Sequence, residues 1–286
     1  MNRDALNLLN AEVAAEVAGI CARAGAAIME IYQEPDVEVR LKADQTPVTA
    51  ADFAAHRVVV DGLRASWPEV PVLSEESGQI LWSERQTWRT YWLVDPLDGT
   101  KEFVKKNDDF TVNVALIQDG EPVMGVIFAP VYGLTYWAAR GLGAFKVDAQ
   151  GSAPIGVSSR QIPRLDAPEP AQARPLTIIV SRSHITGANA QFMSDIEQIY
   201  REPTLLRVGS SLKLCMIADG RADVYPRMGP TSEWDIAAGQ CILEQAGGVV
   251  EQLNGQRLRY NKQSLLNPHF VARSPRVELP KTPQNA

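Results

Sequence analysis

The sequence Asp95-Pro96-Leu97-Asp98-Gly99-Thr100 combines two carboxylates with a proline and a glycine directly after the apolar run 91–94. Proline and glycine let the chain turn tightly, so both acids can point toward one place, with the carbonyl oxygen of Leu97 between them. Hard divalent cations bind several oxygens of this kind, and carboxylates that bridge two ions suit a site about 3.5–4 Å across. A surface turn capped by aspartate would have the same composition for local reasons. The segment alone leaves both interpretations open.

Gly99, Thr100 and Lys101 continue this segment in a way that suits a phosphate. They could begin a helical turn, whose backbone amides and dipole would then face the same place as the two acids. Metal ions on one side and amides on the other would neutralise the charge that develops during attack on phosphorus. A phosphate ester is the substrate class that uses both, so we predict a metal-dependent phosphatase.

The composition of the chain excludes several other classes of protein. With 286 residues, of which 45% are hydrophobic, the chain can bury a large core. No apolar run approaches the roughly 20 residues that span a bilayer, and residues 1–16 lack the layout of a signal peptide. A formal net charge of −6 argues against binding to a nucleic acid polymer, for which a basic face is expected. We therefore expect a cytoplasmic enzyme.

The cysteines and histidines are scattered along the chain without the spacing of a zinc site. Each cysteine lies within an apolar run, which predicts buried thiols without a chemical role; these are Cys21, Cys215 and Cys241. The chain therefore offers few nitrogen and sulfur ligands for a metal ion. A metal here would be held by oxygen, which favours magnesium, manganese or calcium over zinc.

Hydrophobic periodicity predicts a mixture of helices and strands for the first half of the chain. Apolar residues at three- and four-residue spacing indicate helices, whereas alternating or short continuous apolar runs indicate strands. The expected helices are 6–31 and 50–66, and the expected strands are 37–41, 70–73, 91–94, 111–117, 122–128 and 134–138, with another from 141. Short turns separate the strands between 111 and 138, which is typical of an antiparallel meander.

Residues 152–175 are rich in Pro, Ser, Arg and Ala without periodicity, so we place a boundary between two halves there. Beyond it, strands alternate with helices, which is typical of an α/β unit. The expected strands are 176–180, 204–207, 222–225 and 249–253, and the expected helices are 189–200, 211–218 and 235–245. We therefore expect an N-terminal α+β metal-binding half over 1–160, a C-terminal α/β substrate-binding half over 175–273 and a polar, poorly ordered tail over 274–286.

Two further motifs flank the acidic turn. Ser74-Glu75-Glu76-Ser77 lies upstream, and Trp234-Asp235-Ile236-Ala237-Ala238-Gly239 lies downstream. With the stretch 94–103 between them, the chain resembles the lithium-sensitive inositol monophosphatase superfamily from about residue 11 to about residue 272. The resemblance implies an α/β fold with an α+β N-terminal half. Its layers would be those of the αβαβα sugar phosphatases, with the two halves meeting at the metal site.

The same resemblance implies a set of metal ligands. These are the side chains of Glu75, Asp95, Asp98 and Asp235 and the carbonyl oxygen of Leu97, with Glu76 as a neighbour rather than a ligand. Two or three Mg²⁺ ions are implied, with Mn²⁺ as an alternative. A local role is also open to Asp235 at the start of its expected helix, where an N-cap is worth roughly 0.5–2 kcal/mol. The two roles do not exclude each other.

Asp52, in Val48-Thr49-Ala50-Ala51-Asp52, matches the family acid that pairs with the loop threonine, here Thr100. The pair would orient and deprotonate the attacking water, which the metal activates for in-line attack on phosphorus without a phosphoenzyme. Without that resemblance, Asp52 would be interpreted as a solvated acid in the first turn of a helix, where the dipole favours it.

Two features resemble the bacterial 3′(2′),5′-bisphosphate nucleotidase branch of this superfamily: Lys101 after the loop threonine, and the motif Gly229-Pro230-Thr231-Ser232-Glu233-Trp234-Asp235. A nucleotide with two phosphates needs cationic contacts for the phosphate that is not cleaved. The implied substrate contacts are Gly99, Thr100, Lys101, His184, Ser210, Lys213 and Arg227. Local interpretations stay open for two of them, because Lys213 also suits a solvated helix position and His184 a loop.

We therefore predict a magnesium-dependent phosphatase that hydrolyses adenosine 3′,5′-bisphosphate to AMP and phosphate. An inositol or other sugar monophosphatase would use the same metal site, and a non-catalytic regulator that binds metal or nucleotide would use the same fold. Homodimers occur in the superfamily, although the chain offers no heptad or other interface signature. Loose attachment to the inner face of the cell membrane is also compatible with the sequence.

Overall fold

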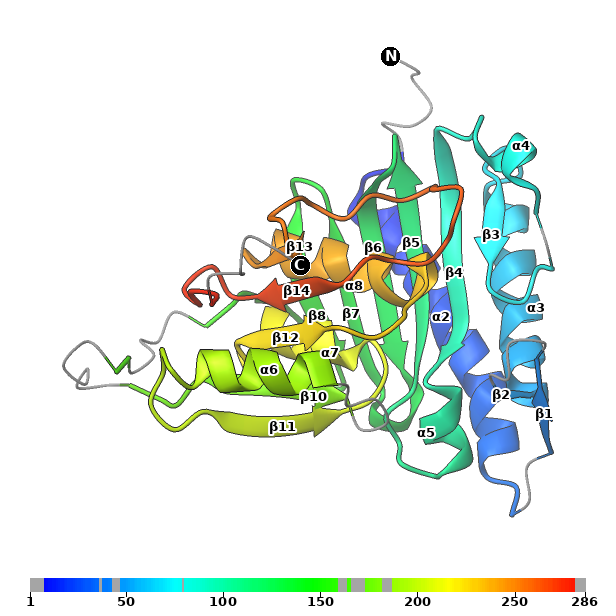
Figure 1. Ribbon diagram of the computed structural model, residues 1–286. Helices are drawn as coiled ribbons and strands as arrows, with labels where there is room; N and C mark the ends of the chain where they lie inside the picture. Colours follow the sequence, from blue (N-terminus) through cyan, green and yellow to red (C-terminus); the bar gives the residue numbers. More distant parts are fainter. Residues whose placement is uncertain are drawn as a thin grey trace.

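The structure is a computed structural model that describes residues 8–35, 38–42, 47–78, 80–158, 164–165, 173–181 and 187–280. Two large β-sheets, with helices between them and on both outer faces, make up most of the fold (Figure 1), and the short strands β1 and β2 form a separate two-stranded sheet. This arrangement is the expected αβαβα layering. Within the described ranges, no helix is both long and apolar enough to cross a membrane.

The larger sheet has seven strands in the order β3-β4-β5-β6-β7-β8-β9. β3 pairs parallel with β4 and all later neighbours are antiparallel, which confirms the expected meander. The strands are β3 (Val72–Ser74), β4 (Thr90–Asp98), β5 (Thr111–Gln118), β6 (Glu121–Ala129), β7 (Leu134–Ala139), β8 (Gly143–Asp148) and β9 (Gly151–Ile155). The expectation of irregular chain from residue 152 is wrong for β9. This edge strand is almost wholly exposed, so no apolar alternation marks it.

Helices cover both faces of the seven-stranded sheet (Figure 1). α2 (Ala11–Tyr32) and α3 (Ala50–Ser66) lie on one face, and α7 (Leu212–Ala218) and α8 (Glu233–Gln245) lie on the other. The first pair comes from the start of the chain and the second pair from its end. The sheet is therefore enclosed by segments that are far apart in sequence.

The alternation of side chains along β4 separates the two cores. Trp92 and Val94 pack in the cluster that contains α2 and α3. Tyr91 and Leu93 point to the opposite face and pack in the cluster that contains α7 and α8. Successive residues of a strand face opposite sides of a sheet, so an uninterrupted apolar run predicts burial on both sides.

The smaller sheet has five strands in the order β11-β10-β12-β14-β13. β10 pairs parallel with β11 and β12, whereas β14 pairs antiparallel with β12 and β13. The strands are β10 (Thr177–Ser181), β11 (Thr204–Val208), β12 (Val224–Arg227), β13 (Val249–Gln252) and β14 (Phe270–Arg273), and α6 (Gly187–Ile196) covers the outer face. Phe192 and Ile196 of α6 pack there with Ile178. No sequence pattern had predicted β14.

Short elements complete the described chain. They are β1 (Val39–Leu41), β2 (Pro47–Thr49), α4 (Trp82–Arg85), α5 (Thr100–Val104) and the 3₁₀ turn η1 (Pro130–Tyr132). The expected helix from residue 6 begins only at Ala11, because the side chain of Asn10 accepts a 2.9 Å hydrogen bond from the N–H group of Val13 and caps it. α3 has the expected bounds.

The two sheets share their largest core. Ile117 in β5 and Phe270 in β14 belong to the same hydrophobic cluster, with α7 and α8 between the sheets. The chain passes from the larger sheet to the smaller one between β9, which ends at Ile155, and β10, which begins at Thr177. The boundary placed at 152–175 stays a prediction. The expected tail is wrong in its first part, because Val277 is 1% exposed and packs against the α6 cluster. Residues 281–286 lie outside the described part of the chain.

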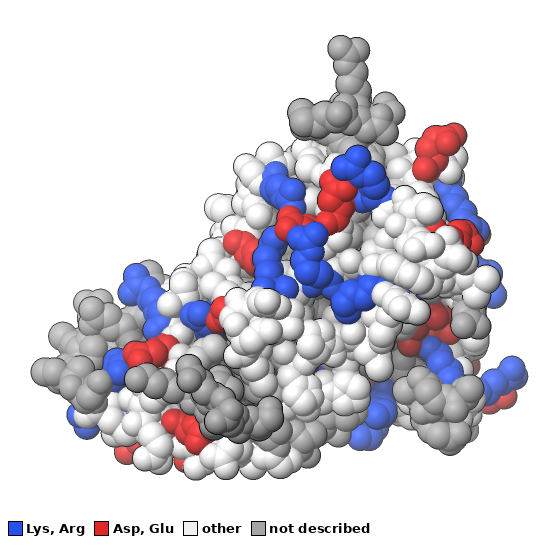
Figure 2. Space-filling view, turned by 45° about the horizontal axis from the view of Figure 1, so that its top comes forward, with Lys and Arg blue, Asp and Glu red and all other residues white. Residues whose placement is uncertain are grey.

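Charged groups on the surface are mixed in sign. On the face seen in Figure 2, basic and acidic side chains are interleaved, with no broad basic area. Glu121, for example, forms ion pairs with Arg140, Arg257 and Arg259. This face therefore offers no continuous basic surface to a polyanion. The three cysteines are free and buried, as expected.

Candidate active site

A cavity of about 440 Å³ lies where β3 and β4 end and where α5, α7 and α8 begin. It brings together most of the residues that the sequence indicated. These are Glu75, Asp95, Leu97, Asp98, Gly99, Thr100, Lys101, Ser210, Lys213, Arg227 and Asp235. Asp52 contacts Thr100 from outside this lining. His184 lies outside the described residues.

Two strand ends bring the acidic residues to this cavity. Glu75 follows β3, and its N–H group donates a 3.1 Å hydrogen bond to the carbonyl oxygen of Val94, so the ends of β3 and β4 stay together. The pairing of β4 with β5 shifts register between Asp95 and Asp98, which turns the chain out of the sheet. Gly99 then has a φ of +95°, a conformation that favours glycine. α5 begins at the next residue, as expected.

Asp52 is only 3% exposed, so its interpretation as a solvated acid is wrong. One of its carboxylate oxygens accepts 2.7 Å hydrogen bonds from the N–H group and the hydroxyl of Thr49, in the capping box that starts α3. The other oxygen accepts a 3.1 Å hydrogen bond from the hydroxyl of Thr100. Burial raises the pKa of Asp52, and the bonds from Thr49 and Thr100 oppose the rise. The expected contact is present, and its role in deprotonating water stays a prediction.

Four carboxylates that line the cavity, those of Glu75, Asp95, Asp98 and Asp235, have raised pKa values, with burial as the largest cause for each. Burial raises the pKa of Asp235 to about 8, and the charges of Asp98 and Glu75 add to the rise. Burial also raises the pKa of Asp95 well above its usual range, with repulsion from Glu75, Asp98 and Asp235. A divalent cation among these groups would lower the pKa values again, because it favours their charged forms.

The donors fit a hard divalent cation chemically, because all of them are oxygens. Leu97 lines the same cavity, and its N–H group donates a 3.1 Å hydrogen bond to Asp95. Among the described residues, no three or more His, Cys, Asp or Glu side chains are already arranged to hold an ion. Glu75 instead forms a 2.7 Å ion pair with Lys42, which also pairs with Glu76. Lys42 would therefore compete with an ion for the carboxylate of Glu75.

Asp235 takes part in the start of α8 without being its N-cap. The helix begins at Glu233, two residues earlier than expected, and Ser232 is the N-cap. The N–H group of Ser232 donates a 2.9 Å hydrogen bond to one carboxylate oxygen of Asp235. The expectation that Asp235 is the N-cap is therefore wrong. Asp235 is the third residue of the helix and completes a capping box with Ser232.

Two cationic side chains, Lys213 and Arg227, also line the cavity. Lys213 is 8% exposed, which contradicts its interpretation as a solvated helix position. Burial lowers the pKa of Lys213 to about 8, and the charge of Asp98 opposes this. Arg227 donates a 2.6 Å hydrogen bond to the carbonyl oxygen of Pro230, and its buried Nε has no hydrogen-bond partner among the described residues. Ser210 beside them has a φ of +46°, in the left-handed region.

The sequence did not predict a chain of hydrogen bonds that connects Asp98 to side chains of β5 and to the start of α7. Asn113 donates a 3.4 Å hydrogen bond to Asp98 and accepts one of 2.7 Å from the hydroxyl of Ser211. That hydroxyl lies 2.8 Å from the hydroxyl of Thr111. Thr111 and Asn113 are polar residues on one face of an otherwise apolar strand, and this alternation is the signal that could have identified them. The partner Ser211, on α7, could not be read from local pattern.

The profile of the inositol monophosphatase family matches residues 9–282 of the chain. The chain therefore belongs to the inositol monophosphatase family, and the family resemblance drawn from its three motifs is confirmed. Within that family it is similar to the 3′(2′),5′-bisphosphate nucleotidase CysQ of Escherichia coli (strain K12). The two are 46% identical over 257 residues, which cover 89% of this chain and 97% of that protein.

Solved structures agree with this assignment. CysQ from Bacteroides thetaiotaomicron, described as a bacterial member of the inositol monophosphatase family, superimposes with a TM-score of 0.81 at 37% identity and covers 95% of this chain and 100% of that chain. The inositol monophosphatase from Anabaena (Nostoc) superimposes with a TM-score of 0.70 at 26% identity, covering 96% and 92% of the two chains. The expected fold class is therefore confirmed.

Proposed function

We propose that the chain is a magnesium-dependent 3′(2′),5′-bisphosphate nucleotidase that hydrolyses adenosine 3′,5′-bisphosphate to AMP and phosphate. Its extensive similarity to the CysQ nucleotidase of Escherichia coli supports the reaction class. Magnesium dependence is general for the inositol monophosphatase family and agrees with the oxygen donors of the cavity.

The observation that carries the proposal is that acidic and cationic side chains line one cavity. Asp95 and Asp235 are among the acids, and Lys213 and Arg227 are among the cations. A substrate with two phosphates uses both kinds of group at once. The scissile phosphate would lie at a metal held by the acids, and the retained phosphate would accept hydrogen bonds from Lys213 and Arg227. A monoester would leave these two cations unused.

Four carboxylates and one carbonyl oxygen would hold the metal, with no nitrogen or sulfur among them. They are Glu75, Asp95, Asp98, Asp235 and Leu97. When bound, magnesium supplies Lewis acidity, which makes water a stronger acid and stabilises negative charge on the phosphate and the leaving oxygen. The number of ions, expected to be two or three, belongs to the proposal. Mn²⁺ meets the same donor preference.

Thr100 and Asp52 would accept the proton of the attacking water. The hydroxyl of Thr100 donates to Asp52 at 3.1 Å, so the lone pairs of its oxygen stay available to accept a hydrogen bond from water. A proton taken by Thr100 can pass to Asp52, whose raised pKa makes it the better acceptor. The oxygen of water then bonds to phosphorus while the ester oxygen leaves with its electron pair. Gly99 and Lys101, at the start of α5, would contact the phosphate.

A comparison of substrates tests this proposal. Adenosine 3′,5′-bisphosphate, its 5′-phosphosulfate relative and inositol 1-phosphate are compared by initial rates of phosphate release, with magnesium and after chelation. We expect kcat/KM to be highest for the first, and activity to vanish without metal. A preference for inositol 1-phosphate would favour a sugar monophosphatase. Release from none of them would favour a regulator.

The proposal includes a cytoplasmic location, which suits a soluble nucleotide substrate. The comparisons lend no support to the expected attachment at the inner face of a membrane. The homodimer also stays a prediction, and light scattering of the purified protein measures it directly.

A further inference from the structure

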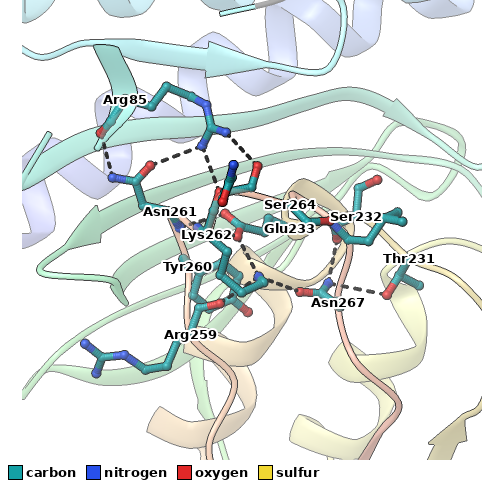
Figure 3. A network of polar contacts seen from close by, with 12 residues as sticks. Arg85, Thr231, Ser232, Glu233, Arg259, Tyr260, Asn261, Lys262, Ser264 and Asn267 are labelled. Carbon is teal, nitrogen blue, oxygen red and sulfur yellow. Dashed lines mark hydrogen bonds and ion pairs between the residues drawn. The ribbon is translucent and has the colours of Figure 1, made fainter. Parts of the chain in front are cut away.

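A buried carboxylate next to the expected metal ligand Asp235 has a separate set of partners. Glu233 is 0% exposed and accepts hydrogen bonds from the N–H groups of Asn261 and Lys262 at 2.8 and 3.0 Å. The ammonium group of Lys262 pairs with the same carboxylate at 2.5 Å. Figure 3 shows Glu233 at the centre of these contacts. Glu233 therefore binds the segment 260–267 to the first turn of α8.

The same segment is held from its other side by α4. Arg85, which is 3% exposed, donates hydrogen bonds of 3.2 Å to the side chain of Asn261 and to the carbonyl oxygen of Lys262. It also donates one of 3.3 Å to the carbonyl oxygen of Gln263. Asn261 returns a 2.8 Å bond to the carbonyl oxygen of Arg85 (Figure 3). The segment is thus clamped between α4 and α8.

The far end of the segment reaches the cavity. The side chain of Asn267 donates a 2.7 Å hydrogen bond to the carbonyl oxygen of Ser232, and its N–H group donates one of 2.8 Å to the carbonyl oxygen of Thr231. Leu266, one residue earlier, lines the cavity and is 57% exposed. Trp234 lines the cavity as well. A well-anchored backbone therefore presents an exposed apolar side chain at the rim of a polar site.

We propose that Leu266 and Trp234 form the contact surface for the base of the nucleotide, and that Glu233 is a positioning residue that holds Leu266 there. This inference rests on the proposed function. A purine is flat and apolar on its faces, and packing it against an aliphatic and an aromatic side chain removes apolar surface of both partners from water. In the proposed function the acids, through the metal, and the two cations bind the phosphates, so the apolar side chains at the rim are left to contact the base.

The first test replaces Leu266 and changes only the base of the substrate. Leu266→Ala is compared with wild type on adenosine 3′,5′-bisphosphate and on ribose 3,5-bisphosphate, which keeps both phosphates and lacks the base. We expect KM for the adenosine compound to rise roughly tenfold, the size of a few lost apolar contacts, with kcat and both constants for the ribose compound nearly unchanged. Leu205→Ala is the matched control, because Leu205 is 53% exposed and lies outside the cavity lining.

The second test concerns Glu233. Glu233→Gln keeps the shape of the side chain and removes its charge, so the pair with Lys262 is lost. We expect faster amide hydrogen exchange in 260–267 and the same selective rise in KM for adenosine 3′,5′-bisphosphate, with kcat changed less than about twofold, because a released Leu266 costs affinity for the base. Should Glu233→Gln not fold, Lys262→Met removes the same ion pair from its other partner, and the same measurements on that variant decide the role of Glu233.

Distinct results overturn the two proposals. If wild type does not hydrolyse adenosine 3′,5′-bisphosphate, the proposed function fails. If wild type hydrolyses it but Leu266→Ala changes both substrates equally or neither, the base contact is wrong. If Glu233→Gln lowers kcat for both substrates with unchanged KM, Glu233 acts on the metal site through α8 instead, and its assigned role is wrong.

Discussion

The two carboxylate oxygens of Asp52 have different partners, one at the start of α3 and the other in the candidate site. One oxygen completes the capping box of α3 with Thr49, and the other receives the hydroxyl of Thr100. The local pattern predicted only that Asp52 lies in the first turn of a helix, and neither its burial nor its contact with Thr49 was predicted. The contact with Thr100 was predicted by the family resemblance. Lys42, which pairs with Glu75, was not predicted at all. Lys42 and Glu75 are distant in sequence, and no local pattern links an exposed β1 strand to the end of β3.

Replacement of Thr100 tests the proton path. Thr100→Ala removes the hydroxyl that donates to Asp52, and we expect kcat to fall by about 10²–10⁴-fold, the usual contribution of a general base. Thr100→Ser keeps the hydroxyl and is the matched control, for which most of kcat should remain. Steady-state kinetics at saturating magnesium measures both variants. Equal kcat values for the alanine and serine variants would exclude a role for the hydroxyl.

Replacement of Arg227 tests the cationic side chains of the cavity. Arg227 lines the cavity, so a phosphate oxygen that accepts from its guanidinium group would gain a charge-assisted hydrogen bond worth about 1.5–3 kcal/mol. We expect Arg227→Ala to lower kcat/KM for adenosine 3′,5′-bisphosphate by roughly 10–100-fold and to change that for inositol 1-phosphate little. Arg227→Lys keeps the charge but lacks the planar guanidinium group, so its kcat/KM for adenosine 3′,5′-bisphosphate should lie between the values of wild type and Arg227→Ala. Equal losses on both substrates would contradict a contact specific to the second phosphate.

At the scale of elements, α8 comes into very close contact with β6. A Cβ atom on Gly125 of β6 would collide with the backbone of Ala238 in α8. This glycine therefore sets how closely the helix that carries Asp235 approaches the sheet. Sequence periodicity identified both elements, but a glycine within a strand indicates only that some backbone approaches closely. It does not say which backbone approaches.

Gly125→Ala should destabilise the protein and disturb the cavity. The added methyl group meets backbone atoms, which cannot move as a flexible side chain can, so we expect the free energy of unfolding to fall by at least about 1–3 kcal/mol. Gly19→Ala in α2 is the control, because its Cβ would meet only the end of the Arg23 side chain at 3.7 Å. That variant should gain roughly 0.4–1 kcal/mol. Urea unfolding measures both, and similar stabilities would refute the close contact.

At the scale of the whole molecule, the expected metal ligands come from distant parts of the chain. Glu75 directly follows β3, and Asp95 and Asp98 lie at the end of β4, whereas Asp235 lies in the first turn of α8, the helix between the two sheets. An ion bound by all of them therefore links the N-terminal part to the C-terminal part. It also relieves the mutual repulsion that raises the pKa values of the acids.

Magnesium should accordingly stabilise the folded protein. An ion that binds only the folded state at a hundred times its Kd adds about 2.7 kcal/mol, so we expect a higher midpoint of thermal unfolding with magnesium than with chelator. Asp235→Asn keeps a side-chain oxygen for the N–H group of Ser232 and should reduce both this shift and turnover, while stability in chelator stays near that of wild type. Retained activity and an undiminished shift in Asp235→Asn would refute Asp235 as a ligand.

Near neighbours in the chain were sufficient to predict the strand ends, the tight turn at Gly99 and the start of α3, because caps, turns and alternation depend on residues only a few positions apart. The three motifs also identified the family and hence the layers. Only the tertiary structure decided that Lys213 is buried in the lining of the cavity that holds the acids, that Lys42 pairs with Glu75 and that Leu266 lines the same cavity. These arrangements join segments far apart in sequence, and local sequence patterns carry no information about which distant segments pack together.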